Sequence, residues 1–315
     1  MKVFVTGSTG FLGSYIVREC IKRKYNTTAL VRKENLEKKR NIISEFSRRG
    51  VRICYGNVIN FEDVKKSLNE NYDIIFHLAS VPKESSSNFV TDINGTENLF
   101  KAIEYNKIKV KKIMYMSTTN VIGPQKLKQS IDENVECKPQ TKYGISKYKA
   151  EQLIKKFCKK YEIDYIIIRA PRIYGPGDWQ KTFLNYIKLA KIGIIPILDN
   201  LPVNLVYVKN LIHGIFLSLQ SRNEIFIISD EKTYSTNEIA DLVEKIIEPK
   251  FFIRFYIPKI IIKSISIITG SFVYGINNVR YSVKKAKQKL HYKNIFSLEE
   301  GMKETIAWYE SKNIL

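Results

Sequence analysis

The amino-acid sequence predicts an α/β protein: a doubly wound parallel sheet followed by a smaller mixed α/β region. In the first half, short apolar runs rich in β-branched residues alternate with longer stretches of helical period. The run at 74–79, Ile-Ile-Phe-His-Leu-Ala, is apolar on both faces, as buried parallel strands are. Alternating strands and helices predict a parallel sheet covered by helices. We expect the first domain at residues 1–170 and the second mainly at 171–315, with segments such as 203–230 returning to the first.

The expected strands lie at residues 2–5, 27–31, 51–55, 73–78, 112–117 and 165–169. Helical stretches separate them, among them 11–24, 89–105 and a helix that runs through about Lys160. After about residue 171 the alternation loosens, and prolines mark loops at Pro171, Pro176, Pro196 and Pro202. Two capping boxes, Ser235 with Glu238 and Ser297 with Glu300, predict helices over 239–247 and to about residue 309, because each side chain can satisfy a backbone N–H at a helix start.

The composition is strongly basic. Among 315 residues, 52 Lys and Arg face 31 Asp and Glu, which gives a formal net charge of +21. A chain of this length can bury two cores, which excludes a disordered tail or a small disulfide-stapled module. Such a positive charge is typical of proteins that bind nucleic acid or anionic membranes. We favour the simpler reading that the lysines are spread over solvated faces of a Lys-, Ile-, Asn- and Tyr-rich protein, and we expect no specific nucleic-acid partner.

The sequence shows neither the features of a secretion signal nor the Cys and His spacing of a metal site. The first residues have a strand pattern without a charged segment, a long apolar segment or a cleavage site, so we expect no secretion signal. The four cysteines include no C-x-x-C pair and the three histidines lie far apart in the sequence, so we expect neither a metal site nor a disulfide framework. A reduced, cytoplasmic location fits these features best.

The stretch 251–276 is very apolar, but Arg254, Pro258, Lys259 and Lys263 interrupt it. Only 264–276 runs without charge, which is shorter than the roughly 20 residues that a bilayer requires. We expect a buried or interfacial helix rather than a transmembrane one. Its basic flanks leave contact with a membrane surface open.

A glycine-rich turn stands between the first strand and the first helix. Gly7, Gly10 and Gly13 are spaced three apart. Glycine lets the chain turn tightly and approach a pyrophosphate without a Cβ in the way, while the following helix N-terminus directs backbone N–H groups at the anion. This context predicts dinucleotide binding.

The G-x-x-G-x-x-G spacing resembles that of short-chain dehydrogenases/reductases, in particular the extended branch that includes the NAD-dependent epimerases and dehydratases. Matches in the expected order cover nearly the whole chain. They are Gly56-Asn57-Val58, His77 to Ser80, Asn94 to Asn98, Ser117 to Gly123, Tyr143-Gly-Ile-Ser-Lys147, Arg169 to Pro176 and Val206 to Asn210. The resemblance implies a Rossmann domain, a C-terminal substrate-binding region and an NAD(P)-dependent enzyme.

The resemblance also implies which residues hold the cofactor. They are Gly7, Thr9, Gly10, Phe11, Leu12 and Gly13 at the turn, Asn57 and Val58 beside the adenine, Leu78, Ala79 and Ser80 toward the nicotinamide, and Tyr143, Lys147, Pro171 and Ile173. The second strand ends in Arg32, where an Asp or Glu usually holds a free ribose 2′-OH and a cation suits a 2′-phosphate. Arg32 therefore favours NADP over NAD, unless it only faces solvent beside the adenine.

Tyr143 and Lys147 stand at i and i+4 of one predicted helix, so their side chains share a face. A nearby ammonium favours the phenolate and brings a phenol toward use as a general base. By resemblance, the third catalytic member is Thr118, which precedes Tyr143 by 25 residues, with the adjacent Ser117 as the fallback. Asn94 matches an Asn that in relatives steadies the helix supporting the catalytic Lys, so we expect a supporting role for it.

The substrate remains open between several classes. Related dehydratases carry an Asp-Glu pair after the catalytic hydroxyl and decarboxylases keep a Glu, whereas this chain has Thr119 and Asn120. We therefore expect epimerisation or simple oxidation and reduction, with a nucleotide sugar as substrate and Arg172 or Lys209 meeting its diphosphate. A reductase of an apolar ketone or alcohol, like 3β-hydroxysteroid dehydrogenase or dihydroflavonol reductase, is one alternative. A non-catalytic NADP-binding regulatory or RNA-binding protein is another.

The assembly is expected by resemblance alone. In relatives the helices that correspond to 89–105 and 143–161 form a two-helix seam between subunits. We therefore expect a homodimer.

Overall fold

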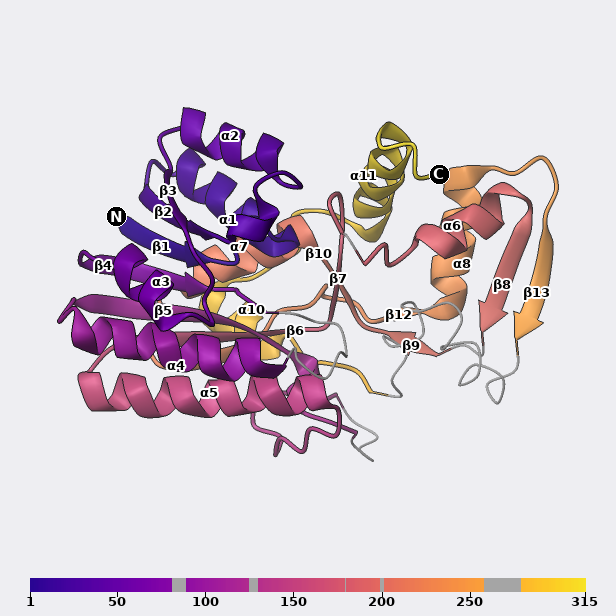
Figure 1. Cartoon of the computed structure of the whole chain (residues 1–315). Coiled ribbons are helices and arrows are strands. Elements are labelled where there is room, and N and C mark those ends of the chain that lie inside the picture. Colours follow the sequence, from indigo (N-terminus) through magenta and orange to yellow (C-terminus); the bar gives the residue numbers. More distant parts are fainter. Residues whose placement is uncertain (81–88, 125–129, 179, 199–200, 258–278) are drawn as a thin grey trace. The chain divides into compact units, whose positions relative to one another are not determined.

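The computed structural model describes residues 1–80, 89–124, 130–178, 180–198, 201–257 and 279–315 (Figure 1). The chain divides into two compact units. The first consists of Met1–Pro124, Val135–Arg169 and Ile215–Phe226, and the second of Gln125–Asn134, Ala170–Gly214 and Ile227–Leu315. Each unit thus combines segments that are far apart in the sequence. Residues 215–226 belong to the first unit because they lead into a strand at the edge of its sheet.

The first unit contains a seven-stranded sheet in the order β11-β6-β5-β4-β1-β2-β3, as far as the described residues go. The strands are β1 (Lys2–Thr6), β2 (Asn26–Val31), β3 (Arg52–Tyr55), β4 (Tyr72–His77), β5 (Val110–Thr118), β6 (Asp164–Ala170) and β11 (Glu224–Ile227). β1 pairs in parallel with both β2 and β4. The chain therefore winds outward in both directions from β1, and ligands of such sheets bind beyond the carboxyl ends of the strands at this reversal point.

Helices pack on this sheet. They are α1 (Phe11–Lys22), α2 (Arg40–Arg48), α3 (Phe61–Ser67), α4 (Phe89–Tyr105) and α5 (Lys142–Tyr161), and the long helices α4 and α5 lie against one another (Figure 1). Strand residues such as Ile75 and Ile113 are fully buried in one cluster with Leu99 of α4 and Ile154 of α5. Burial of these side chains, at about 25 cal/mol per Å² of apolar surface, fixes the helices whose ends carry the polar residues described below.

The second unit is built from smaller elements. Its described residues form three two-stranded pairs: β7 (Arg172–Tyr174) with β10 (Leu205–Tyr207), β9 (Pro202–Val203) with β12 (Tyr234–Ser235), and β8 (Ile194–Leu198) with β13 (Ile253–Ile257). Its helices include α6 (Leu184–Lys191), α8 (Thr236–Ile247), α10 (Lys284–Leu290) and α11 (Leu298–Ser311), and α7 (Val208–Ser218) leads back to the first unit. Both predicted capping boxes form, at Ser235 with Glu238 and at Ser297 with Glu300.

The fold class predicted from the sequence is confirmed, and the six expected strands lie within two residues of their predicted ends. The prediction of a helix over 251–276 is wrong for the described part of that stretch. Residues Ile253–Ile257 form strand β13 instead, because alternating Ile, Phe and Ile find a backbone partner in β8. The remainder of that stretch, 258–278, lies outside the described residues. Within the described part of the chain, no helix is long and apolar enough to cross a membrane.

Candidate active site

The glycine turn connects β1 to α1 in a conformation that only glycine fits. Gly7 has a φ of +67°, and a Cβ there would lie 2.9 Å from the backbone of Leu78 and of Ala79. A Cβ on Gly13 would lie 2.0 Å from the carbonyl oxygen of Gly7. The turn closes when the N–H of Gly10 donates to that same carbonyl at 3.0 Å. The chain thus doubles back tightly at the sheet's reversal point and leaves backbone, not side chains, at its surface.

The N-terminus of α1, the helix that follows the turn, has the features of an anion-binding site. α1 begins after Gly10, whose lack of a side chain leaves the first N–H groups without a side-chain cap. Its first turn carries no acidic residue. Uncapped N–H groups and the partial positive charge of a helix N-terminus fit a phosphate, and a dinucleotide supplies one. Thr9 and Leu12 are buried, and Phe11 packs edge-on against Tyr15.

The other predicted cofactor residues of the first unit follow neighbouring strands of the sheet. Arg32 is exposed directly after β2, and Asn57 and Val58 follow β3. Leu78, Ala79 and Ser80 follow β4 and are half-buried. All of these lie at carboxyl ends of parallel strands, and Leu78 and Ala79 lie against Gly7 of the glycine turn, so the residues present fit a dinucleotide in this place.

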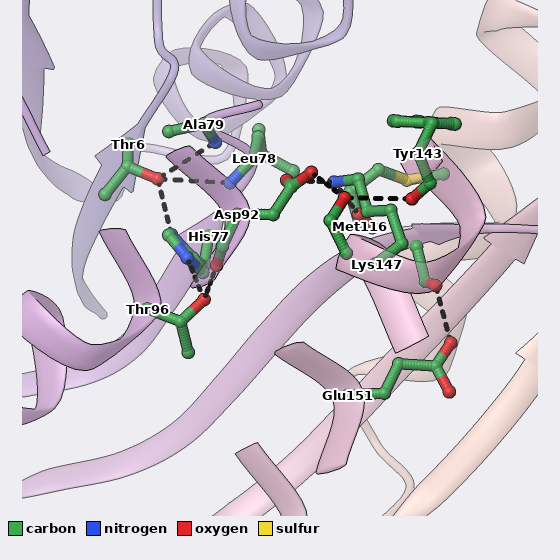
Figure 2. Close-up of polar contacts among 12 residues, drawn as sticks. Thr6, His77, Leu78, Ala79, Asp92, Thr96, Met116, Tyr143, Lys147 and Glu151 are labelled. Atoms are coloured by element: carbon green, nitrogen blue, oxygen red, sulfur yellow. Dashed lines mark hydrogen bonds and ion pairs between the residues drawn. The ribbon is translucent and has the colours of Figure 1, made fainter. Parts of the chain in front are cut away.

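Tyr143 and Lys147 lie in the first two turns of α5, which Thr141 caps by accepting the N–H of Gly144 at 3.0 Å. The Lys147 ammonium is buried and donates to the carbonyl oxygen of Met116 at 2.9 Å (Figure 2). It lies 6.0 Å from the centre of the Tyr143 ring. The i, i+4 pair predicted from the sequence is thus brought together.

The Tyr143 phenol lies in a setting that disfavours loss of its proton. Burial raises its pKa above the ordinary value, and the negative charge of Asp92 raises it further. In the described structure Tyr143 is therefore a proton donor at neutral pH. Use as a base requires an added positive charge nearby, and the oxidised nicotinamide of a bound cofactor carries one.

Thr118 and Ser117 end β5 with different partners. The buried Ser117 hydroxyl donates to Glu151 Oε1 at 2.5 Å. Among the described residues, the Thr118 hydroxyl only accepts, from the N–H of Asn120 at 3.2 Å, and so keeps its proton available. The turn after Thr118 packs on the start of α5, where a Cβ on Gly144 would lie 2.6 Å from the carbonyl oxygen of Asn120. This contact brings the end of β5 next to Tyr143.

Lys147 takes its support from Asp92 rather than from Asn94. Asn94 is exposed on α4, whereas Asp92 is buried with its Oδ1 3.1 Å from Lys147 Nζ. Its Oδ2 accepts from the Ser146 hydroxyl at 2.9 Å. Residues two positions apart on a helix, such as Asp92 and Asn94, point about 200° away from each other, so only one of them can face α5. The supporting role expected for Asn94 stays a prediction, and the contact with Lys147 comes from Asp92.

A chain of hydrogen bonds runs from the glycine turn to Asp92 through His77 (Figure 2). Thr6 Oγ1 accepts the N–H groups of Leu78 and Ala79, at 3.1 and 3.2 Å, so its own proton goes to His77 Nδ1 at 2.9 Å. His77 Nε2 then donates to Thr96 Oγ1 at 3.0 Å, and Thr96 donates to the Asp92 carbonyl at 2.5 Å. Burial lowers the pKa of His77 to about 3, which keeps the ring neutral as this pattern requires.

The remaining predicted residues belong to the second unit. Pro171, Arg172 and Ile173 lie at or in β7, and the Arg172 guanidinium reaches Gln180 Oε1 at 3.3 Å. Burial lowers the pKa of Arg172. Lys209, on α7, pairs with Glu304 at 2.7 Å and lies 4.8 Å from the Phe296 ring centre.

Sequence reasoning missed the buried carboxylates on the helices that carry and face Tyr143 and Lys147. Asp92 lies just outside the matched Asn94–Asn98 segment and contacts Lys147. Glu151 continues the face of α5 that holds Tyr143 and Lys147, and it forms a buried ion pair with Arg169 at 2.7 Å. A charged residue on an apolar face at i+4 from a catalytic Lys is the signal that could have found it.

Comparison with known proteins identifies the family. The model of the "NAD dependent epimerase/dehydratase family" matches residues 3–228. The chain is 26% identical to a UDP-glucose 4-epimerase of Vibrio cholerae, over 99% of this chain and 96% of that protein. It is 24% identical to a UDP-N-acetyl-alpha-D-glucosaminuronate decarboxylase of Bacillus cytotoxicus, over 98% and 97%. The structure resembles a UDP-glucuronic acid 4-epimerase of Bacillus cereus in complex with UDP-glucuronic acid and NAD, with a TM-score of 0.80, 22% identity and coverage of 99% and 100%.

Proposed function

The chain belongs to the NAD dependent epimerase/dehydratase family, of the extended short-chain dehydrogenase/reductase type, and from this premise we propose that it epimerises or reduces a nucleotide sugar. The observation that carries the proposal is the buried Lys147 ammonium, which is anchored to Met116 and Asp92 one helical turn from Tyr143. Burying a cation beside a phenol costs free energy and gives a protein that only binds ligands no advantage. Proton exchange at Tyr143, in contrast, requires a cation close to the phenol.

Each residue has a separate role in this proposal. The glycine turn and the α1 N-terminus hold the cofactor pyrophosphate. A bound nicotinamide would supply the hydride acceptor and donor. Tyr143 exchanges the proton of the substrate hydroxyl, Lys147 favours the phenolate, and Thr118 donates its unused proton to the substrate oxygen.

Epimerisation or reduction is preferred to dehydration or decarboxylation because of the residues after Thr118. Elimination of water needs a side chain that can donate and accept a proton at the adjacent carbon. Thr119 is buried and Asn120 is exposed, and neither has a carboxyl group. Relatives include both epimerases and a decarboxylase, so family membership alone leaves the reaction open.

We also propose that NADP is the preferred cofactor. Arg32 is exposed at the end of β2, where a guanidinium can hold a 2′-phosphate by two hydrogen bonds. Replacing it by Asp should reverse the preference, so that NADP binds at least about tenfold more weakly and NAD is retained. Titrations of both cofactors against both proteins measure this. Equal affinities in the wild-type protein would contradict the assignment and leave Arg32 as a solvent-facing residue.

The reaction is tested with Tyr143→Phe. This change removes the exchanging proton and leaves the glycine turn intact, so turnover should fall by about a thousandfold or more while cofactor affinity changes little. Near-normal activity in this variant would contradict the mechanism. Arg222→Ala, a change at an exposed cation outside the site, serves as a surface control.

The substrate class is tested by thermal shift with UDP-, GDP- and dTDP-sugars in the presence of NADP or NAD. A sugar nucleotide should raise the melting temperature beyond the cofactor alone, because it binds only the folded state. Stabilisation by a steroid or dihydroflavonol, and by no sugar nucleotide, would replace this proposal with the apolar-ketone reductase.

A further inference from the structure

Asp92 places a buried carboxylate beside the catalytic ammonium. It is 1% exposed, and its Oδ1 lies 3.1 Å from Lys147 Nζ. We propose that Asp92 is a positioning residue for the Tyr143–Lys147 pair: its carboxylate fixes Lys147 and offsets the ammonium charge, and it thereby sets the pH range in which Tyr143 exchanges its proton. The inference rests on the proposed function, since it concerns the same two residues.

The contacts of Asp92 hold it in one position. Its Oδ2 accepts from the Ser146 hydroxyl, its backbone carbonyl accepts from Thr96, and Thr96 is held in turn by His77. Lys147 is fixed from the other side by the carbonyl of Met116. The two charges therefore cannot separate by rotation of either side chain without breaking a buried hydrogen bond.

Burial of Lys147 and Asp92 strengthens the electrostatic effect of the Asp92 charge on its neighbours. The side chains of Lys147 and Asp92 are 3% and 1% exposed, so little solvent screens them. An ammonium alone would favour the Tyr143 phenolate, and a carboxylate at the same place opposes it. With both present, the pair is close to neutral, and Tyr143 keeps its proton to a higher pH than Lys147 alone would allow.

Other titratable groups packed around the pair do not replace this charge. On β4, His77 is neutral, and on β5, burial raises the pKa of Tyr115 well above its ordinary value, so that it stays protonated. On α5, Glu151 is paired with Arg169 of β6. Among the described residues of these elements, Asp92 is thus the carboxylate that faces Lys147.

The test is the titration of Tyr143 itself, which needs no substrate. Protein labelled with ¹³C at tyrosine Cζ shows one resonance per tyrosine, and the signal of Tyr143 is the one absent from Tyr143→Phe. In Asp92→Asn the side chain keeps its shape and loses its charge. The Tyr143 resonance should then titrate at a pH lower by about one unit or more than in the wild-type protein, a tenfold easier loss of the proton.

Thr96→Val is the matched control, because it removes the hydrogen bond to the Asp92 backbone and leaves the carboxylate in place. It should lower stability and leave the Tyr143 titration within about 0.3 unit of the wild type. An unchanged titration in folded Asp92→Asn would overturn the proposal. If Asp92→Asn and Asp92→Ser both fail to fold while Thr96→Val folds, Asp92 is required for the fold and the proposal is overturned as well.

Activity then separates this inference from the proposed function. With an active substrate, the pH at which kcat reaches half its maximum should fall in Asp92→Asn by the same amount as the Tyr143 titration. If no substrate or cofactor binds, the proposed function fails, but the titration difference between wild type and Asp92→Asn still decides the role of Asp92.

Discussion

At the scale of single residues, the structure separates two adjacent hydroxyls that the sequence left as alternatives. Ser117 donates to Glu151, which also holds Arg169, so its hydroxyl belongs to a buried network. Thr118 has no such acceptor in the described structure, and its proton is available to a substrate oxygen. We therefore propose Thr118, rather than Ser117, as the residue that donates to a substrate oxygen, on physical grounds as well as by motif.

This assignment predicts opposite consequences for two substitutions. Thr118→Val should lower kcat by about a hundredfold, as loss of one donor to a reacting oxygen does, with a nearly unchanged melting temperature. Ser117→Ala should instead lower the free energy of unfolding by about 1 kcal/mol and retain much of the activity, because Glu151 keeps its contacts to Arg169. Steady-state kinetics and urea unfolding of both variants measure the split, and the reverse pattern would assign the substrate contact to Ser117.

At the scale of elements, the site depends on how closely β1 and α1 approach each other. The carbonyl of Gly7 fills the place that a side chain at position 13 would need. Gly10, between these two glycines, has no side chain and so leaves the first N–H groups of α1 without a side-chain cap. The turn, the helix start and the anion site are therefore one structural feature.

We accordingly predict that Gly13→Ala abolishes cofactor binding and lowers the free energy of unfolding by about 2 kcal/mol, because the methyl group must displace backbone. Gly50→Ala is the matched control. Gly50 has a φ of +79°, yet nothing lies within 4 Å of its Cβ position, so only about 1 kcal/mol of backbone strain is expected and cofactor binding should persist. Cofactor titration and denaturant unfolding give both quantities; tight binding by Gly13→Ala would contradict this account of the turn.

At the scale of the whole molecule, stability should depend on pH through His77. Its pKa is lowered to about 3 in the folded protein, whereas an unfolded histidine titrates near 6.5. Between about pH 6.5 and about pH 3, His77 binds a proton in the unfolded chain and stays neutral in the folded protein. The free energy of unfolding therefore falls as the pH falls through this range. The burial of Asp230 in the second unit acts oppositely, since it raises that pKa to about 6 and the folded state gains stability on protonation.

We predict that His77 alone removes about 2 kcal/mol from the free energy of unfolding between about pH 6.5 and about pH 4.5. Denaturant unfolding at both values, in wild type and in His77→Asn, isolates this part as the difference in slope. Proton NMR provides an independent check: with three histidines in the chain, the His77 signal should stay at its neutral position until the protein unfolds. A His77 signal that titrates near pH 6.5 in folded protein would refute the buried neutral ring.

The excess positive charge and the assembly also belong to this scale. Exposed positions of α5 carry several lysines, Lys142, Lys149, Lys156 and Lys159. The homodimer expected through this helix stays a prediction. Such a dimer would bring like charges together and should therefore strengthen as salt is added.

The sequence by itself determined the fold class, the position of the glycine turn and the Tyr143–Lys147 pair, because these depend on local spacing: period 2 or 3.6, three glycines, and i with i+4. Tertiary structure decided which polar groups meet. It chose Asp92 over Asn94, separated Ser117 from Thr118, and linked Thr6 to Asp92 through His77. It also turned the start of the apolar stretch at 251 into strand β13. These outcomes depend on residues far apart in sequence that burial forces to satisfy one another, and no local pattern records such partners.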